Sequence, residues 1–303
     1  INTVPMATNQ GFKSLVPNSA FVDSSFLYWW LKTHRSDLEA MGRGATFKEI
    51  AKAITAGITI PLPPIEEQRQ IAAVLDQADE LRAKRRAALA LLDTLTESIF
   101  LDMFGDPVTN PMGLPVRALG TLGTVLTGNT PPRERREYFG DAIEWVKTDN
   151  IEPPNPYLTA AREGLSAAGR LAGRVVPAGS VLVTCIAGSP TSIGNAAIAD
   201  REVAFNQQMN ALVPTAPYSL YVHALLRASK VLIRASSTNS MKGMISKSRF
   251  TSIMLPIADL PLQAAFERRS RHVQVQRSLH EAAVSQAEAL FVALHHRAFR
   301  GEL

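Results

Sequence analysis

The sequence predicts a mixed α/β protein in which two copies of one unit are joined by a pair of long helices. Three observations lead to this fold class: an internal sequence repeat, two long segments with the periodicity of coiled-coil helices, and a block of short strand-like runs. With 303 residues, of which 46% are hydrophobic, the chain is long enough for two or more domains with buried cores.

The repeat is visible in two motifs with the same order of residue types. Residues 8–17 read TNQGFKSLVP and residues 205–214 read FNQQMNALVP, and an aromatic or apolar helical stretch follows each motif. Beyond these stretches the two copies keep a constant spacing of 195 positions, as between Gln68 and Gln263. Two copies of one unit imply a molecule with a pseudo-two-fold axis. The first copy has no counterpart of residues 116–203, so we expect its globular block to be incomplete.

Two segments have the signature of long helices. Residues 66–104 contain neither Pro nor Gly, and their apolar residues follow one another in steps of three and four, interrupted only by Arg85. Prolines precede this segment and Gly105 follows it, as is usual at helix ends. Residues 261–299 repeat the pattern less regularly. The residues predicted to make the helix contacts are Ile71, Leu81, Leu92, Leu95, Ile99, Phe266, Leu290 and Leu294.

Each of these helices needs a partner, because neither is apolar on all sides. At about 1.5 Å per residue, each would be roughly 55–60 Å long. The repeat favours an intramolecular pair of antiparallel helices that acts as a spacer between the two globular blocks. An ordinary dimerisation coiled coil is the alternative.

The block between the two helices contains short strand-like runs bounded by turn residues. Residues 180–187 are rich in β-branched and apolar side chains, residues 143–147 form a second run, and residues 218–236 have a helical pattern. Cys185 is the only cysteine, and its place inside the first run indicates a small buried hydrophobic residue rather than a nucleophile. A single thiol fits a reducing cytoplasm.

Positive charge is concentrated in the same block. The net charge of the chain is +5, and residues 115–255 carry 15 Lys and Arg against 9 Asp and Glu, whereas residues 61–114 carry 5 against 9. A basic block suits a polyanion such as DNA, because each neutralised phosphate releases condensed counterions. A solvated basic surface is the alternative, and charge alone does not decide between them.

Three stretches offer side chains suited to DNA contact. An arginine-rich loop at residues 133–136 suits phosphates or a guanine edge, although a solvated loop is an equally weighted alternative. Residues 147–150 follow a strand, and the amides at 206–208 suit adenine. The candidate DNA contacts are Arg133, Arg135, Arg136, Lys147, Thr148, Asn150, Ser189, Thr191, Ser192, Gln208, Lys242, Lys247 and Lys52.

Residues that occur in both copies are better candidates for scaffold or phosphate contact than for base reading. Asn206 and Gln207 repeat as Asn9 and Gln10, so we expect their amides to bond to the backbone. Lys247 repeats as Lys52, which favours phosphate contacts for both.

Catalytic motifs are absent from the sequence. It has no Gly-x-x-x-x-Gly-Lys-Ser/Thr phosphate loop, and Asn155-Pro156-Tyr157 lacks the second proline of the Asn-Pro-Pro-Tyr/Phe methyltransferase motif. Glu144 and Lys147 have the spacing Glu-x-x-Lys, whereas a nuclease site needs Glu-x-Lys. The six histidines have no metal-ligand spacing, and no apolar run is long enough to cross a membrane. We therefore expect a cytoplasmic binding protein that is not an enzyme and binds no metal or cofactor.

Four stretches resemble the specificity subunits of type I restriction–modification systems. Residues 60–71, IPLPPIEEQRQI, followed by a long helix, resemble the central conserved region of these subunits. Residues 119–132 and 143–151 resemble the start of their target-recognition domains, and the closing AFRGEL at 298–303 resembles the end of their distal conserved region. The resemblance covers essentially the whole chain, and the motifs occur in the family's order.

This resemblance implies four regions. Residues 1–60 would be the C-terminal part of a truncated first target-recognition domain, 61–105 the central helical spacer, 106–258 the second target-recognition domain and 259–303 the distal helical spacer. Each target-recognition domain would read one half of a split, asymmetric site in double-stranded DNA.

The resemblance also implies the partners of the chain. The helices would dock two methyltransferase (M) subunits, which restriction (R) subunits would join. S-adenosylmethionine, ATP and Mg would be used by these partners. Two alternatives remain open at this point: a specificity segment of a fused restriction–methylation enzyme, and a coiled-coil scaffold that does not bind DNA.

Overall fold

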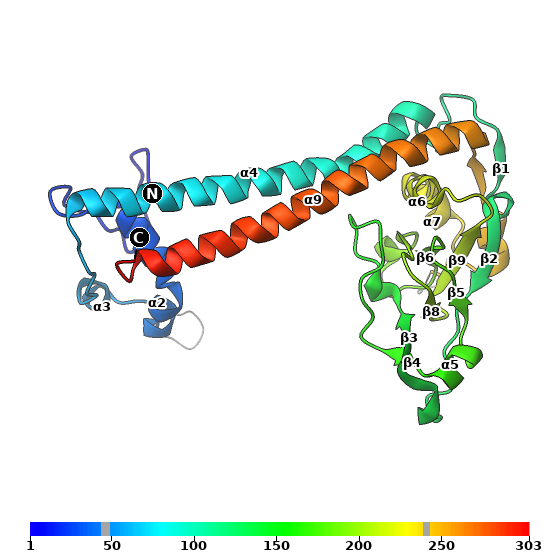
Figure 1. Ribbon diagram of the computed structural model, residues 1–303, viewed down its shortest axis with the longest axis horizontal. Helices are drawn as coiled ribbons and strands as arrows, with labels where there is room; N and C mark the ends of the chain where they lie inside the picture. Colours follow the sequence, from blue (N-terminus) through cyan, green and yellow to red (C-terminus); the bar gives the residue numbers. More distant parts are fainter. Residues whose placement is uncertain (44–48, 239–242, 303) are drawn as a thin grey trace. The chain divides into compact units, whose positions relative to one another are not determined.

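The computed structural model describes residues 1–43, 49–238 and 243–302. The chain divides into two compact units, the first formed by Ile1–Leu89 and Ser278–Leu303 and the second by Ala90–Arg277. Two long helices, α4 (Ile65–Phe104) and α9 (Leu260–Ala298), each contribute one part to the first unit and one part to the second (Figure 1).

The described part of the first unit is helical. Besides its parts of α4 and α9 it contains α1 (Ser24–Thr33), α2 (Arg35–Met41) and α3 (Lys52–Ala56). Asp23 sets the start of α1, because its side chain accepts hydrogen bonds from the first free backbone N–H groups of the helix. The core of this unit joins Phe26 and Trp29 of α1 to α4 and α9.

The second unit is the mixed α/β part of the chain. Its strands are β1 (Val116–Ala118), β2 (Gly123–Thr127), β3 (Phe139–Val146), β4 (Gly164–Leu165), β5 (Val175–Val176), β6 (Val181–Thr184), β7 (Ala196–Ile198), β8 (Val203–Phe205), β9 (Met209–Pro214) and β10 (Met254–Pro256). Its α-helices are α5 (Ala167–Ala172), α6 (Ser219–Ala228), α7 (Lys230–Ala235) and α8 (Lys247–Thr251), with 3-10 turns η1 (Leu119–Leu122), η2 (Arg136–Tyr138), η3 (Thr148–Asn150) and η4 (Pro190–Ser192).

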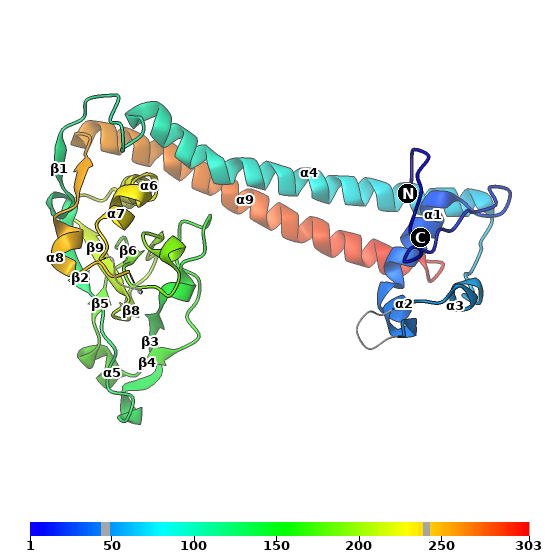
Figure 2. The ribbon, with the colours of Figure 1, turned by 180° about the vertical axis from the view of Figure 1, so that it is seen from behind.

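The strands form three small sheets. One antiparallel sheet has the order β2-β9-β6-β7, and a mixed sheet has the order β4-β3-β8-β5, in which β3 and β8 are parallel. A third sheet pairs β1 with β10. Figure 2 shows these strands from behind.

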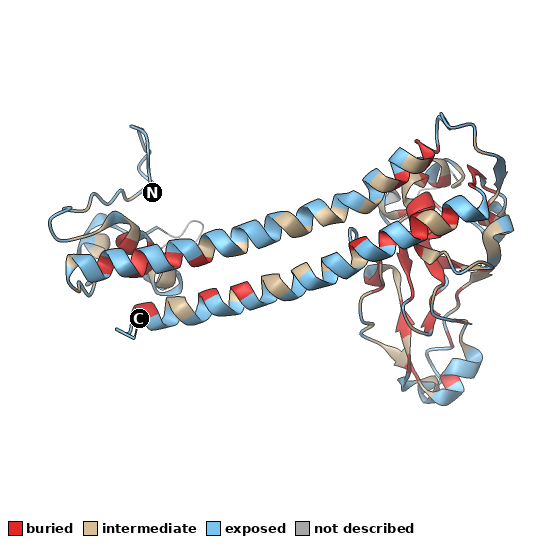
Figure 3. Ribbon diagram, turned by 45° about the horizontal axis from the view of Figure 1, so that its top comes forward, coloured by how far each residue is buried: buried red, intermediate tan, exposed pale blue. Residues whose placement is uncertain are grey.

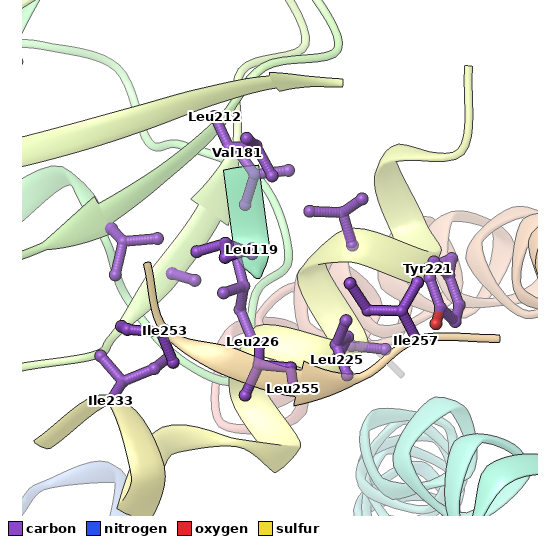
Figure 4. Close-up of a cluster of buried hydrophobic side chains, with 14 of the residues drawn as sticks. Leu119, Val181, Leu212, Tyr221, Leu225, Leu226, Ile233, Ile253, Leu255 and Ile257 are labelled. Atoms are coloured by element: carbon purple, nitrogen blue, oxygen red, sulfur yellow. The ribbon is translucent and has the colours of Figure 1, made fainter. Parts of the chain in front are cut away.

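Strand β6 is buried on both faces, which explains its continuous run of apolar residues. Val181 and Val183 point into the core that includes α6, and Leu182, between them, packs on the opposite side in a separate cluster. The residues labelled in the close-up of the first core are Leu119, Val181, Leu212, Tyr221, Leu225, Leu226, Ile233, Ile253, Leu255 and Ile257 (Figure 4).

The helix predicted over residues 218–236 is interrupted. The backbone of Ser229 has φ −88° and ψ 12°, outside the helical range, and it ends α6 and begins α7. The prediction of one continuous helix is therefore wrong at this residue.

The internal repeat is confirmed by equivalent ion pairs between α4 and α9. In the first unit Arg82 Nη1 lies 3.3 Å from Glu288 Oε2, and in the second unit Arg277 Nε lies 2.8 Å from Asp93 Oδ1. Arg82 and Arg277 are 195 positions apart, and so are Asp93 and Glu288. The same antiparallel contact is thus made once in each unit.

Aromatic and amide contacts repeat in the same way. The rings of Phe26 and Phe299 are 5.6 Å apart, and the equivalent rings of Tyr221 and Phe104 are 5.3 Å apart. Gln68 is buried and donates to the carbonyl of Pro63 at 2.8 Å. Its equivalent, Gln263, is also buried and donates to the carbonyl of Ala258 at the same distance.

The predicted line of contact between the helices is partly wrong. Ile71 and Phe266 are buried, and Leu92, Ile99 and Leu294 are half-buried. The remaining predicted contacts, Leu81, Leu95 and Leu290, are 41%, 40% and 48% exposed. Both long helices carry exposed positions along much of their length (Figure 3).

Charged residues explain this difference. Arg82, Asp93 and Arg277 occupy positions that face the neighbouring helix, where their ion pairs replace hydrophobic contacts. A search for apolar periodicity passes over charged residues. It therefore predicts helix contacts about one residue away from the positions that make them.

Candidate nucleic-acid interface

Several loops of the second unit meet where strands end. Asn129 N–H donates to the carbonyl of Phe205 at 3.0 Å, and Asn206 N–H donates to the carbonyl of Val146 at 3.2 Å. Cys185 N–H donates to the carbonyl of Gln208 at 2.8 Å. These bonds join residues 128–138, 147–150, 185–192 and 206–208 into one surface, which we call the loop edge.

Two further features fix the loop edge. A Cβ at Gly128 would lie 2.1 Å from the carbonyl oxygen of Asn206, so only glycine allows these two segments to approach so closely. Ile245 N–H donates to the carbonyl of Cys185 at 3.0 Å, which brings the segment before α8 to the same edge.

The three predicted arginines of the first loop have different surroundings. Arg136 is exposed and has no ion pair or hydrogen bond from its side chain among the described residues. Arg135 donates to the hydroxyl of Tyr138 at 2.8 Å, and its guanidinium lies 5.5 Å from the centre of the same ring. Arg136 is therefore the one best placed to move toward a phosphate.

Arg133 and Lys147 share one carboxylate. Arg133 Nη1 donates to Glu163 at 2.8 Å, and Lys147 Nζ donates to it at 2.5 Å. Both cations also lie 4.9 Å from the centre of the Trp145 ring. The hydrogen bond from Lys147, followed by that from Arg133, holds the pKa of Glu163 below its usual value, so the carboxylate is charged.

The turn between β8 and β9 is stabilised by hydrogen bonds from its own amide side chains. Asn206 is buried; its Nδ2 donates to Gln208 Oε1 at 2.8 Å, and its Oδ1 accepts from the Gln208 backbone at 3.2 Å. The expected scaffold role of Asn206 is therefore confirmed. Gln207, between them, is exposed and accepts from the hydroxyl of Thr130.

Gln207, which was expected to bond to the backbone because it recurs as Gln10, is instead the exposed amide of this turn. The sequence feature that could have indicated this is its position in the short turn between two apolar strands. Residues 203–206 and 209–212 are buried, so the short turn between them has to expose part of its side chains.

Asn150 is a structural residue, which corrects its choice as a base contact. It is only 6% exposed, its Oδ1 accepts from the Lys147 backbone at 2.9 Å, and its Nδ2 donates to the carbonyl of Ala160 at 2.9 Å. No polar atom of its side chain is left for DNA. Thr148, in the same 3-10 turn, is half-buried.

The other candidates lie at several places. Ser189, Thr191 and Ser192 follow β6, and the hydroxyls of Ser189 and Thr191 are 2.7 Å apart. Lys247 is the exposed first residue of α8. Lys52, in the first unit, is the exposed first residue of α3. Lys242 lies outside the described residues.

Cys185 has no features of a reactive thiol. It is buried, and burial raises the pKa of its thiol to about 12. Within residues 1–43, 49–238 and 243–302, no three His, Cys, Asp or Glu side chains are grouped to hold a metal ion. No helix in this part of the chain combines the length and apolar character of a membrane span.

The comparisons with known proteins identify the family. A model of the type I restriction modification DNA specificity domain matches residues 1–91 and 112–265. The chain is 31% identical over 165 residues to the type I restriction enzyme MjaIX specificity subunit of Methanocaldococcus jannaschii, covering 48% of this chain and 38% of that protein. It is 29% identical over 106 residues to the HindI specificity subunit of Haemophilus influenzae, covering 34% of this chain and 22% of that protein.

Solved structures share the fold. The S subunit of a type I restriction–modification system from M. genitalium has a TM-score of 0.60 at 16% identity, with 93% of this chain and 74% of that chain covered. A chain from a study of complex assembly and conformational transition of the type I R-M system has a TM-score of 0.59 at 20% identity, with 94% and 73% covered.

The mixed α/β second unit and the two long helices form a fold that these solved chains share. The chain belongs to the type I restriction modification DNA specificity domain family. The matched segments span about a fifth to two fifths of the curated relatives' own length.

Proposed function

We propose that this chain is a sequence-specific DNA-binding specificity subunit of a type I restriction–modification complex. The observation that carries the proposal is the family match over most of the chain, which includes the loops that form the loop edge. Exposed Arg136 and Lys247 and the outward amide of Gln207 supply the chemistry that phosphates and base edges need. The second unit would read one half of a split, asymmetric site in double-stranded DNA.

The proposed partners are two M subunits, docked on the helices, and R subunits that join them. The internal repeat supports this arrangement, because it gives α4 and α9 equivalent residues in the two units. The chain itself is proposed to be non-catalytic. Methylation with S-adenosylmethionine, and cleavage with ATP and Mg, would belong to the partner subunits.

A salt titration of duplex binding tests the proposal. Affinity measured by fluorescence anisotropy should fall steeply as KCl is raised, with a slope set by the number of phosphates contacted. Mapping of methylated positions in a host that carries the intact system should then give both half-sites and their spacing. An affinity for duplex that does not respond to salt would favour a coiled-coil scaffold instead.

A further inference from the structure

We propose that Arg133 and Glu163 together read one G·C base pair from the major groove. This inference rests on the proposed function and concerns one contact within it. A G·C pair presents acceptors at guanine N7 and O6 and a donor at cytosine N4. A guanidinium beside a carboxylate presents the complementary donors and acceptor.

The two side chains are held in place but remain accessible. Arg133 is fixed on one side by Glu163 and lies 4.9 Å from the centres of both the Phe139 and Trp145 rings. Its side chain is nevertheless 53% exposed, and that of Glu163 is 39% exposed. Stacking and a carboxylate partner leave the guanidinium little freedom to rotate, which suits a bidentate contact.

Arg133 also has donors to spare. Its only hydrogen bond to a described residue uses Nη1, so Nε and Nη2 have no partner in the described part of the chain. Arg201, on the same domain, differs in this respect. Its Nε and Nη2 bond to Glu144, its Nη1 bonds to Asp200, and it also bonds to the carbonyls of Leu158 and Thr159. All three guanidinium nitrogens of Arg201 thus donate hydrogen bonds within the domain, whereas only Nη1 of Arg133 does so.

The carboxylate argues against a phosphate as the ligand of this cluster. A phosphate brought to Arg133 would also approach the charged Glu163, and the two anions repel each other. A base edge carries no net charge, so Glu163 gives no such penalty. Lys147, which bonds to the other carboxylate oxygen, keeps the cluster at a net charge of +1 and helps it to lie near DNA.

The test uses the half-site given by methylation mapping and the full chain. Each guanine of the half-site is replaced in turn by 7-deazaguanine, which lacks the N7 acceptor, and duplex affinity is measured. We expect one replacement to weaken wild-type binding about tenfold or more. In Arg133→Ala the affinity should no longer depend on that guanine. In Glu163→Gln the preference for G·C at the same pair should fall, while affinity for unrelated duplex stays equal or rises.

Glu144→Gln is the matched control, because it alters a carboxylate–arginine pair on neighbouring β3. It should leave the base preference unchanged. A contrary result would be that each 7-deazaguanine replacement weakens binding of Arg133→Ala as much as it weakens binding of the wild type, while only the salt slope falls. In that case Arg133 contacts a phosphate and the inference is wrong. Absence of any sequence preference in the wild-type chain would instead refute the proposed function.

Discussion

The three arginines of the loop at residues 133–136 differ in how many of their donors are free to bind a ligand. Arg133 is held by a carboxylate and two rings, Arg135 is held by a tyrosine, and only Arg136 has no side-chain partner among the described residues. The sequence groups the three together because they are separated by at most one residue. Their separate roles depend on Glu163 and Tyr138, which the fold brings beside them.

Arg136 and Lys247 are expected to hold phosphates. Changing either to Ala should weaken binding to all duplexes by a similar factor and lower the salt slope by about 0.9, because one counterion fewer is released. Arg117→Ala is the control, since this exposed arginine precedes β2 while the loop edge follows it. Anisotropy titrations on a cognate and an unrelated duplex would check this, and a change in base preference would contradict it.

His223 should make the stability of the second unit depend on pH. It is buried, and its Nε2–H donates to the carbonyl of Ala196 at 3.1 Å. Burial, and then the charge of Arg227, lower its pKa to about 4 from an ordinary value of 6.5. The unfolded chain therefore binds the proton more tightly, so the stabilisation is complete above about pH 6.5 and is lost as pH falls toward 4.

Replacing His223 by Gln should flatten this dependence. Urea unfolding at pH 7.5, 6.0 and 5.0 would measure it, with the wild type losing more stability than the variant over this range. His295 titrates in the same direction, because burial also lowers its pKa, and it remains in both proteins. Equal losses in the two proteins would show that His223 is not the cause.

Residue type alone did not predict which polar groups of the candidate interface are available. Asn150 has the right chemistry for adenine, but its amide is used by Lys147 and Ala160. The partner at residue 160 is placed by the path of the chain between β3 and β4, which no local pattern records. Recurrence in the first copy assigned the buried Asn206 correctly, whereas the same argument was wrong for Gln207, whose side chain is exposed.

At the level of elements, the extents of the two long helices could be predicted, but not their facing sides. Absence of Pro and Gly and the flanking residues define the ends of a helix, and α4 and α9 match the prediction within a residue or two. The side of each helix that faces the other contains an arginine, Arg82 or Arg277. Each arginine forms an ion pair with the neighbouring helix, which its charge alone does not reveal. Apolar periodicity is therefore an incomplete guide to a helix pair with internal ion pairs.

Arg277→Ala should destabilise the second unit by about 1–3 kcal/mol, because the carboxylate of Asp93 would be left in a mostly buried position without its partner. The charge-swapped double variant Asp93→Arg/Arg277→Asp should recover part of this loss. Chemical unfolding of the single and double variants would measure the coupling. Losses that simply add would show that the pair does not interact.

At the level of the whole molecule, the repeat was the most informative feature of the sequence. It predicted a fold with two equivalent halves, and the contacts of Phe26 with Phe299 and of Tyr221 with Phe104 confirm this equivalence. The strand order and the meeting of four loops at one edge were not predictable in this way. They depend on pairings such as β3 with β8, which join segments far apart in the chain.

The repeat also pairs two exposed leucines. Leu95 and Leu290 are 195 positions apart, one in each unit, and are 40% and 48% exposed. Both were predicted to make helix contacts, yet a large part of each side chain is exposed. Two equivalent apolar residues in the two halves are what two copies of one partner would contact.

We therefore expect Leu95→Glu and Leu290→Glu each to weaken the docking of one M subunit, and the double variant to weaken both. Native mass spectrometry of the complex should show a shift from two bound M subunits to one in each single variant, and to none in the double variant. Folding should change by no more than about 0.5 kcal/mol, since both positions lie at the surface. Leu171→Glu is the control, because this residue is 90% exposed on α5 and should leave the complex intact. If either single variant loses both M subunits, or the double variant keeps both, the two leucines are not separate docking points.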